Sequence, residues 1–362
     1  MDSLVRSCGT NLSYQPMMFM RLLLISARTN CSLISMKKLL NQIKTSILLL
    51  LLTTLNAYSQ IVHPPRAFDL KVLNEWMEDI SNWERWGSDD QLGTLNLITP
   101  EVRKNAAALV KEGISVSLSV DLDVTPSINN TSPFEHKLDR VGQWTMDTYS
   151  VNYHGYTHSH LDAPRHISVD GKIYNGYAIE SIEEPGPGNM GVQHMKNGIF
   201  SRGLLVDIPR LKGIPYLEPG TAITIRDLED WEKENNLKVG SGDILLIRTG
   251  RWAREKAKGL WKFDEKAAGL HASTAKWLKE KDVAVLGSDG TADVLPSGCI
   301  GQTHPLHQLV LIALGMPILD NLNLEDVAVV AAEQNRWEFL LVVAPMRIQG
   351  GTGSPVNPIA TF

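Results

Sequence analysis

Four histidines, a tyrosine and an aspartate gather in one thirteen-residue stretch, HGYTHSHLDAPRH (154–166). The first five of them occupy alternate positions: His154, Tyr156, His158, His160 and Asp162. Every second side chain of a β-strand points to the same face. A strand here would present imidazole, phenol and carboxylate groups along one face, where a core strand would carry Val or Ile.

Imidazole and carboxylate groups are ligands of divalent transition metals such as Zn and Mn. Same-face neighbours on a strand lie ~6.6 Å apart at Cα, so two of them converge on one ion more easily than three. His160 and Asp162 are therefore the best pair, and His158 joins them if the strand bends, or serves a second ion. Pro164 ends the strand, which leaves His166 free to approach from another direction, where it is placed for proton transfer.

In the alternative interpretation, the histidines lie on a solvent-exposed strand and form only hydrogen bonds. The presence of Asp162 on the same face as three of them disfavours this alternative. Further ligands are expected from residues 301–327. His304 and His307 share one helical face there, and either one is a candidate ligand. Asp320 comes at the end of an apolar strand. Its position is explained equally well by a role as a metal ligand and by an ordinary Asp-Asn turn.

The chain as a whole excludes other classes of site. It contains no Gly-X-Ser-X-Gly, phosphate-binding glycine loop or Cys-X-X-Cys. Trp83, Trp86 and Trp144 are candidates for an aromatic wall beside a planar substrate, although core packing is the more ordinary role for each.

The beginning of the chain has the pattern of a secretory signal peptide. Two lysines follow Met36, an apolar run ends at Leu52, and small residues precede Gln60. We expect residues 1–35 to be an over-extended leader and residues 36–59 to be the signal peptide. The apolar run is too short for a membrane span, so a periplasmic or secreted protein is predicted, with no membrane contact after cleavage.

The part of the chain after this leader is acidic. The leader holds six of the 35 Lys and Arg and one of the 40 Asp and Glu, which leaves a net charge of about −10 for the rest. This charge argues against a nucleic acid partner and leaves a small-molecule substrate as the expected partner. One cysteine, Cys299, remains after cleavage, so we expect no internal disulfide.

Helical and strand patterns alternate in the second half of the chain, which predicts an α/β or mixed α+β class. Strands are expected over 114–122, 143–164, 203–208, 243–250, 283–289 and 339–348. Helices are expected over 73–86, 99–112, 225–237, 273–282 and 304–315.

The histidine stretch resembles the motif of the cyclase family of metal-dependent hydrolases, which includes bacterial kynurenine formamidase and isatin hydrolase. That motif is His-X-Gly-Thr-His-X-Asp-X-Pro-X-His, and THSHLDAPRH (157–166) is similar to its second half. WGSDDQLGTLNLITPE (86–101) and GDILLIRTGR (242–251) also look like longer members of the family. The resemblance implies a swivelling β/β/α fold, a single domain over 66–362, and a homodimer or higher homo-oligomer.

The resemblance also implies roles for individual residues. His160 and Asp162 would be metal ligands, His307 and Asp320 would be the later ligand pair, and His166 would be the catalytic acid/base. The site would hold one or two divalent ions.

Three positions depart from the family motif. Tyr156 stands where the first ligand histidine is expected, and His158 stands where a small Gly is expected. The later carboxylate ligand of the family is a glutamate, whereas this chain has an aspartate, Asp320, one residue further along the sequence. We expect His158 to take over the role of the missing ligand.

These residues suit hydrolysis of an amide, formamide or lactam bond, with His166 moving the proton. Two other functions use the same residues: an exported metal-binding protein without turnover, and a metal-dependent lyase or dehydratase.

Overall fold

The computed structural model describes Lys44 and residues 64–179 and 188–362. Residues from 64 onward belong to one compact unit. The expected leader and signal peptide lie outside the described residues apart from Lys44, so they stay predictions. Within the described ranges, no helix is both long and apolar enough to cross a bilayer.

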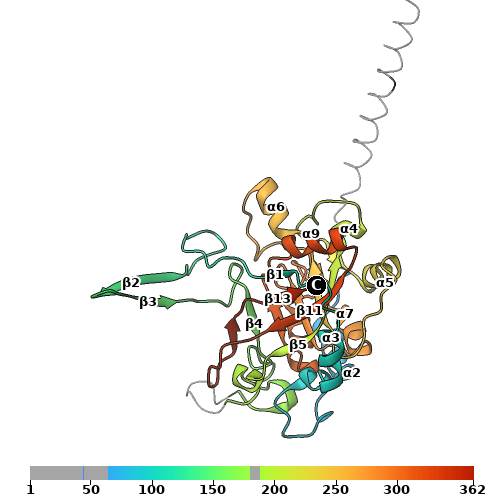
Figure 1. The fold of residues 1–362 in the computed structure, drawn as a ribbon. Coiled ribbons are helices and arrows are strands. Elements are labelled where there is room, and N and C mark those ends of the chain that lie inside the picture. Colours follow the sequence, from blue (N-terminus) through green and yellow to red (C-terminus); the bar gives the residue numbers. More distant parts are fainter. Residues whose placement is uncertain (1–43, 45–63, 180–187) are drawn as a thin grey trace, which may run out of the picture. The chain divides into compact units, whose positions relative to one another are not determined.

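A nine-stranded sheet organises the compact unit (Figure 1). Its four central strands are parallel: β5 (Ile199–Asp207), β7 (Ile244–Arg248), β9 (Val285–Ser288) and β10 (Ile318–Asp320). Antiparallel strands extend the β5 side: β11 (Glu338–Val343), β13 (Ile359–Thr361) and β1 (Ser115–Ser117). Antiparallel strands also extend the β10 side: β4 (His160–Asp162) and β12 (Gly353–Pro355).

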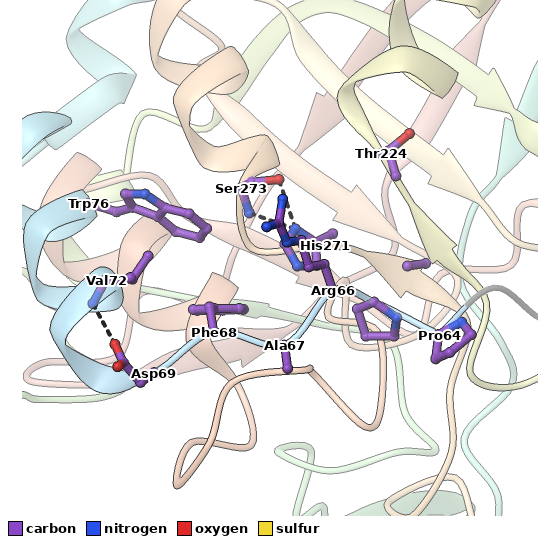
Figure 2. Close-up of a pocket in the computed structure, with 12 residues that line it drawn as sticks. Pro64, Arg66, Ala67, Phe68, Asp69, Val72, Trp76, Thr224, His271 and Ser273 are labelled. Carbon is purple, nitrogen blue, oxygen red and sulfur yellow. Dashed lines mark hydrogen bonds between the residues drawn. The ribbon is translucent and has the colours of Figure 1, made fainter.

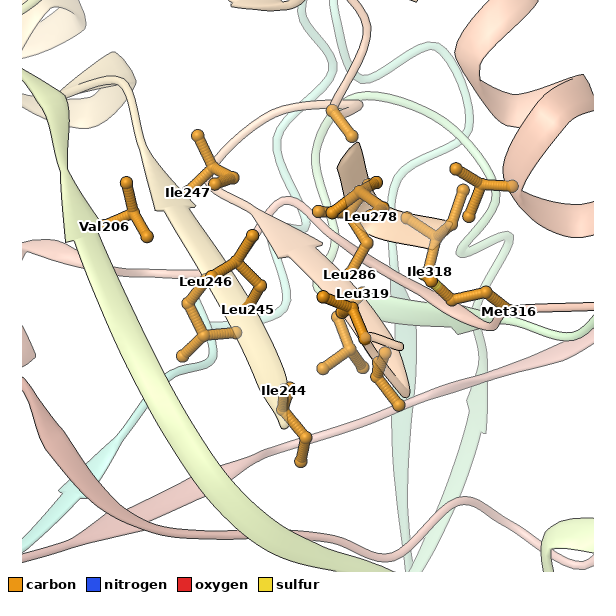
Figure 3. Packing of buried hydrophobic residues seen from close by; sticks show 14 of the residues in the cluster. Val206, Ile244, Leu245, Leu246, Ile247, Leu278, Leu286, Met316, Ile318 and Leu319 are labelled. Carbon is orange, nitrogen blue, oxygen red and sulfur yellow. The ribbon is translucent and has the colours of Figure 1, made fainter. Parts of the chain in front are cut away.

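The central strands form because their apolar residues are continuous. Every residue of β7 is buried, from Ile244 to Arg248, as expected for a parallel strand that is covered on both faces. Leu245, Leu286 and Ile318 are neighbours on one face of the sheet, and Figure 3 shows them among the buried apolar side chains of β7, β9 and β10. The mixed α/β class predicted from the sequence is confirmed.

Helices connect and cover the strands. The longer ones are α2 (Leu70–Asp79), α3 (Pro100–Ala107), α5 (Ile225–Glu234), α6 (Arg251–Lys258), α7 (Thr274–Glu280) and α9 (Glu325–Gln334). Short helical segments are α4 (Ile208–Leu211), α8 (Pro305–His307), η1 (Gly93–Leu97), η2 (Tyr174–Gly176) and η3 (Val192–Met195). A separate pair of short parallel strands is β6 (Ala222–Ile223) and β8 (Gly269–Leu270).

Local signals place several of these boundaries. The Thr99 hydroxyl accepts from the Val102 N–H, and Pro100 occupies the first helical position of α3. This is the predicted start. The helix ends at Ala107 instead of the predicted Glu112.

The strand predicted over 143–164 is wrong as one continuous element. Residues Trp144–Ser150 form β3, which pairs with β2 (Glu135–Val141) in a separate hairpin. Residues 151–159 are not strand, and 154–158 bend. Sheet structure resumes only at β4, so the alternation of side chains along 154–162 does not hold.

The helix predicted over 304–315 has two parts. α8 covers one turn, and η4 (Gln308–Leu314) continues it with π-helical geometry. Gly315 ends it with a φ of 66°, and a Cβ at Gly315 would lie 2.6 Å from the Tyr174 ring. Glycine is required at this position by both its backbone conformation and its packing.

Candidate active site

Strand pairing brings the two candidate ligand segments together. β4 lies between β10 and β12, and His160 is opposite Asp320 in the antiparallel register. Asp162, two residues along β4, is buried as completely as His160 and Asp320. Residues about 160 positions apart in the sequence therefore meet at one end of the sheet.

One group of possible metal ligands contains His154, His160 and Asp162, whose ligand atoms all lie within 4.8 Å of one another. His154 Nδ1 is 2.9 Å from Asp162 Oδ1, and His160 Nε2 is 3.5 Å from the same oxygen. The other nitrogen of each ring is held in place. His160 Nδ1 donates to the His158 carbonyl at 2.8 Å, and His154 Nε2 is 3.0 Å from Thr352 Oγ1.

A second group contains Asp162, His307 and Asp320. His307 Nε2 lies 3.4 Å from Asp320 Oδ2 and 3.9 Å from Asp162 Oδ2. His307 Nδ1 donates to Asp293 Oδ2 at 2.5 Å. Asp162 thus belongs to both groups, with one oxygen facing each.

The donor set fits divalent ions. Asp162 Oδ1 and Asp320 Oδ1 are buried without a hydrogen-bond donor in the described part of the chain, and an unpaired buried carboxylate is costly. His160 and His307 each point Nε2 at these carboxylates while Nδ1 is held by a hydrogen bond. Metal-binding histidines are typically fixed in this way. Cations held by the two groups would compensate the charge of both carboxylates.

The charges of these residues are strongly coupled. Burial alone would raise the pKa of Asp162, but His160, His154 and His166 outweigh it and hold that pKa well below its usual range. Burial likewise opposes protonation of His307, yet hydrogen bonds to Asp293 and Asp320 raise its pKa well above the usual value. Without a metal, His307 would therefore carry the positive charge that balances Asp320.

His166 lies beside both groups and is a member of neither. Its Nε2 is 3.7 Å from Asp162 Oδ2, and its ring stacks on the His154 ring with 4.0 Å between centroids. Burial, together with the neighbouring His154, outweighs the attraction of Asp162 and lowers the pKa of His166 to about 4. The ring is neutral at pH 7 and can accept a proton.

A cavity of about 400 Å³ opens over these residues. The five candidates His160, Asp162, His166, His307 and Asp320 line it, together with His154, Tyr156 and His304. None of the three tryptophans proposed as an aromatic wall is among its lining residues. A larger cavity of about 720 Å³ lies elsewhere, between Phe68, Trp76 and His271 (Figure 2). Among the described residues, none that lines this larger cavity belongs to a group of candidate metal ligands, so the chemistry is assigned to the smaller cavity.

Comparison with known proteins agrees with this site. The family model named Cyclase matches residues 93–292, more than half of the 362-residue chain. The chain belongs to the cyclase family.

Individual relatives extend this finding to the fold. A crystal structure described as a novel cyclase is 30% identical, with a TM-score of 0.71 over 78% of this chain and 99% of that one. Kynurenine formamidase from Bacillus cereus is 22% identical over 250 residues, which cover 66% of this chain and 95% of the relative. Isatin hydrolase A from Ralstonia solanacearum shares the fold, with a TM-score of 0.51 and 20% identity over 68% of this chain and 91% of that one.

The structure does not bring His158 into either candidate ligand group, which differs from the arrangement that the sequence suggested. Its backbone carbonyl holds His160, but its ring belongs to neither ligand group. The ring lies against a separate cavity of about 340 Å³. The physical reason is the bend at 154–158, which brings His154 Nδ1 to Asp162 and leaves His158 outside both groups. Tyr156 lines the main cavity and packs near Phe263, with 5.6 Å between the rings.

A pair of substitutions separates these two histidines. We expect His154→Ala to lose metal from the first group, because it removes the Nδ1 atom that faces Asp162. His158→Ala should keep its metal, since the backbone carbonyl that holds His160 is unchanged. Metal content per chain, measured after exhaustive dialysis, tests this, and equal losses in the two variants would contradict it.

A buried clamp that the sequence did not reveal ties the two ligand segments together. Arg251 donates from Nη1 to Asn321 Oδ1 at 2.6 Å and from Nη2 to the Tyr156 carbonyl. Asn321 Nδ2 donates to the Gly155 carbonyl at 2.7 Å and to the His158 carbonyl at 3.2 Å. Asn321 directly follows the candidate ligand in β10, and the chain bends there with a φ of 54°, so this Asp-Asn pair contributes both a candidate ligand and a clamp residue.

The clamp should control metal affinity. Asn321 has a φ of 54°, so Asn321→Gly removes the side chain while keeping a residue that tolerates this conformation. We expect metal affinity to fall about 10–100-fold, the usual cost of losing an outer partner of the ligands. Asn335→Gly is the matched control, since Asn335 has a φ of 48° at the end of α9. Competition with a chelator measures the affinity, and equal affinities in the two variants would contradict a role for the clamp.

Proposed function

We propose that this member of the cyclase family is a metal-dependent amidohydrolase, similar to arylformamidases, that cleaves an amide, formamide or lactam bond of a small substrate. The observation that supports this best is a pair of metal-ligand groups sharing Asp162, with an unused neutral histidine beside them. The named relatives, a kynurenine formamidase and an isatin hydrolase, make a carbonyl–nitrogen bond the first choice.

His154, His160 and Asp162 would hold one ion, and Asp162, His307 and Asp320 would hold another. A divalent metal supplies a Lewis acid for the substrate carbonyl and lowers the pKa of water to about 7. Nitrogen and oxygen ligands of this kind suit Zn or Mn.

The protein's own part in the reaction is proton transfer and positioning. His166 Nε2 takes a proton from the attacking water and gives it to the leaving nitrogen. Its stacking on His154 fixes the plane of the ring, and Asp162 attracts the imidazolium that forms. His304 and Tyr156 border the space left for the substrate.

Two rival functions use the same residues. In a metal-binding protein without turnover, every histidine would be a ligand, whereas His166 lies outside both groups. A lyase or dehydratase would act on a substrate that bears a leaving group beside an acidic carbon. A panel of aryl formamides, lactams, esters and hydroxy acids, assayed with metal-loaded and chelator-treated protein, separates the three. Retained metal without any turnover would contradict the hydrolase.

We also propose that the protein is exported and is processed near Gln60. The signal-like sequence over 36–59 supports this. N-terminal sequencing of protein from the natural host tests it, and an intact Met1 or Met36 would refute it.

A further inference from the structure

The larger cavity, of about 720 Å³, is a second concave site that the proposed reaction does not use. It shares no lining residue with the cavity over the metal-ligand groups. Its walls come from the segments 64–69, 222–224 and 271–273 and from α2. Sites for small molecules typically have volumes of ~300–1,000 Å³, so this cavity has the size of a ligand site. We call it the aromatic cavity, after Phe68, Trp76 and His271.

Three rings line the aromatic cavity, and Figure 2 shows them together. The ring centroids of Phe68 and Trp76 lie 5.0 Å apart. The His271 ring meets both of them edge-on, at 5.5 Å from Phe68 and 6.4 Å from Trp76. Phe68 and Trp76 are half-buried, so each keeps part of its ring free for a ligand. Aromatic rings pack favourably against other aromatic rings, which favours a flat aromatic ligand.

Hydrogen bonds hold this group of rings in place. The Phe68 N–H donates to the Gly298 carbonyl at 3.0 Å, and the Phe68 carbonyl accepts from the Ile300 N–H at 2.9 Å. The Asp69 carboxylate caps the start of α2, where it accepts from the Val72 N–H at 3.0 Å. The rings are therefore in position before a ligand arrives, as is usual for small-molecule sites.

Most polar side chains around the aromatic cavity are already bonded within the protein. Thr224 Oγ1 donates to Asp227 Oδ2 at 2.8 Å, and Ser273 Oγ lies 2.8 Å from His271 Nδ1. Arg66 differs, because its guanidinium forms no ion pair or hydrogen bond in the described part of the chain. An arginine without an anionic partner beside an apolar cavity favours a ligand that carries a carboxylate.

His271 provides a second donor in the aromatic cavity. Its Nδ1 accepts from the Ser273 N–H at 3.3 Å, so the proton of the neutral ring lies on Nε2. That Nε2 is buried and has no hydrogen-bond partner among the described residues. Burial lowers the pKa of His271, an effect that the neighbouring Arg66 backbone opposes. The ring is therefore neutral at pH 7 and acts as a donor through Nε2.

The charges around the rings also suit an anion. Lys276 Nζ lies 5.5 Å from the centroid of the Trp76 ring and 3.1 Å from Asp79 Oδ2. Among the described residues, Asp69 is the one carboxylate that lines the aromatic cavity. The N-terminus of α2, which Asp69 caps, partly compensates its negative charge. A ligand carboxylate therefore meets a positive group at Arg66 and little opposing charge elsewhere.

We propose that the aromatic cavity is a second small-molecule site, separate from the metal-ligand groups, that binds a planar aromatic carboxylate. The ring of the ligand lies against Phe68 and Trp76. Its carboxylate accepts hydrogen bonds from Arg66, with His271 Nε2 as the second donor. No metal ligand lines this cavity, so the ligand binds whether or not the metal site is filled.

The first test is isothermal titration calorimetry of the full chain with 2-naphthoate, and with 2-naphthamide as the neutral probe of the same shape. We expect 2-naphthoate to bind about tenfold more tightly than 2-naphthamide, because the amide lacks the charge that Arg66 recognises. Binding of 2-naphthoate should survive treatment with a chelator. No binding, or binding that disappears with the metal, would overturn the proposal. Equal affinities for the two probes would refute the carboxylate assignment.

Two substitutions locate the binding. Trp76→Leu should weaken both probes about tenfold, since it removes a ring from the cavity. Arg66→Gln should weaken 2-naphthoate alone, by about tenfold, and remove the preference for the acid over the amide. Trp86→Leu and Arg226→Gln are the matched controls, because neither residue lines the aromatic cavity. The Arg226 side chain is 88% exposed on α5. Both controls should bind the probes as the parent does.

The unfolding temperature of each variant separates a lost site from a lost fold. Arg66 is exposed, so Arg66→Gln should unfold at the temperature of the parent and keeps the test valid even if Trp76→Leu is unstable. If Arg66→Gln retains the parent's affinity for 2-naphthoate, or loses no more than Arg226→Gln does, the carboxylate does not bind at this cavity and the proposal fails.

Discussion

Asp162→Asn should remove metal from both ligand groups and reduce hydrolysis to the level of the chelator-treated parent. Asp162 is the one residue that the two groups share, and each of its oxygens faces a different group. The amide keeps the shape of the side chain but loses the charge that balances a divalent ion. The loss of metal affinity should exceed the roughly 10–100-fold that follows the loss of an outer partner. Elemental analysis of the dialysed variant gives the number of ions per chain.

Asp320→Asn is the matched comparison. Asp320 is as buried as Asp162 and belongs to the second group alone. We expect it to lose the ion held with His307 and to keep the ion held with His154 and His160. The parent and the two variants should then differ in the number of bound ions. An Asp162→Asn protein with the metal content of the parent would refute the shared-ligand arrangement.

Residue types and spacing were enough to predict which parts of the chain meet. His160, Asp162 and His166 were expected to work with His307 and Asp320, and all five line one cavity. The pairing of β4 with β10 accounts for this. The sequence suggested that these segments meet but not how, because a three-residue strand carries too little pattern to define its partner.

His154 shows why the rest could not be predicted. His154 and His160 are an even number of residues apart, which the sequence shows. An even spacing places two side chains on the same face only where the chain is a β-strand. Residues 154–158 bend, and the clamp from Arg251 through Asn321 to the Gly155 carbonyl holds that bend. The hydrogen bonds that shape this segment come from α6 and from the turn after β10. No local pattern in 151–159 encodes them, so the preference for His154 over His158 as a candidate ligand appears only in the folded chain.

His166→Asn should bind metal as the parent does and turn over substrate about 10²–10⁴-fold more slowly, the usual contribution of a positioned acid/base. His166 belongs to neither ligand group, so its loss removes no ligand. Its lowered pKa, about 4, leaves the ring neutral at pH 7, which is the form that a general base requires. The rate constant kcat for an aryl formamide or a lactam, measured beside metal content, tests both halves of this expectation.

His304→Asn gives the control for a histidine in the same cavity. His304 lines the cavity but forms no ion pair with a carboxylate in the described residues, and its ring lies 5.6 Å from that of His307. We expect its kcat to stay much closer to that of the parent, with any change falling mainly on KM, because it borders the substrate without moving a proton. If His166→Asn loses metal together with activity, His166 is a ligand. If its kcat equals that of His304→Asn, proton transfer belongs to another group.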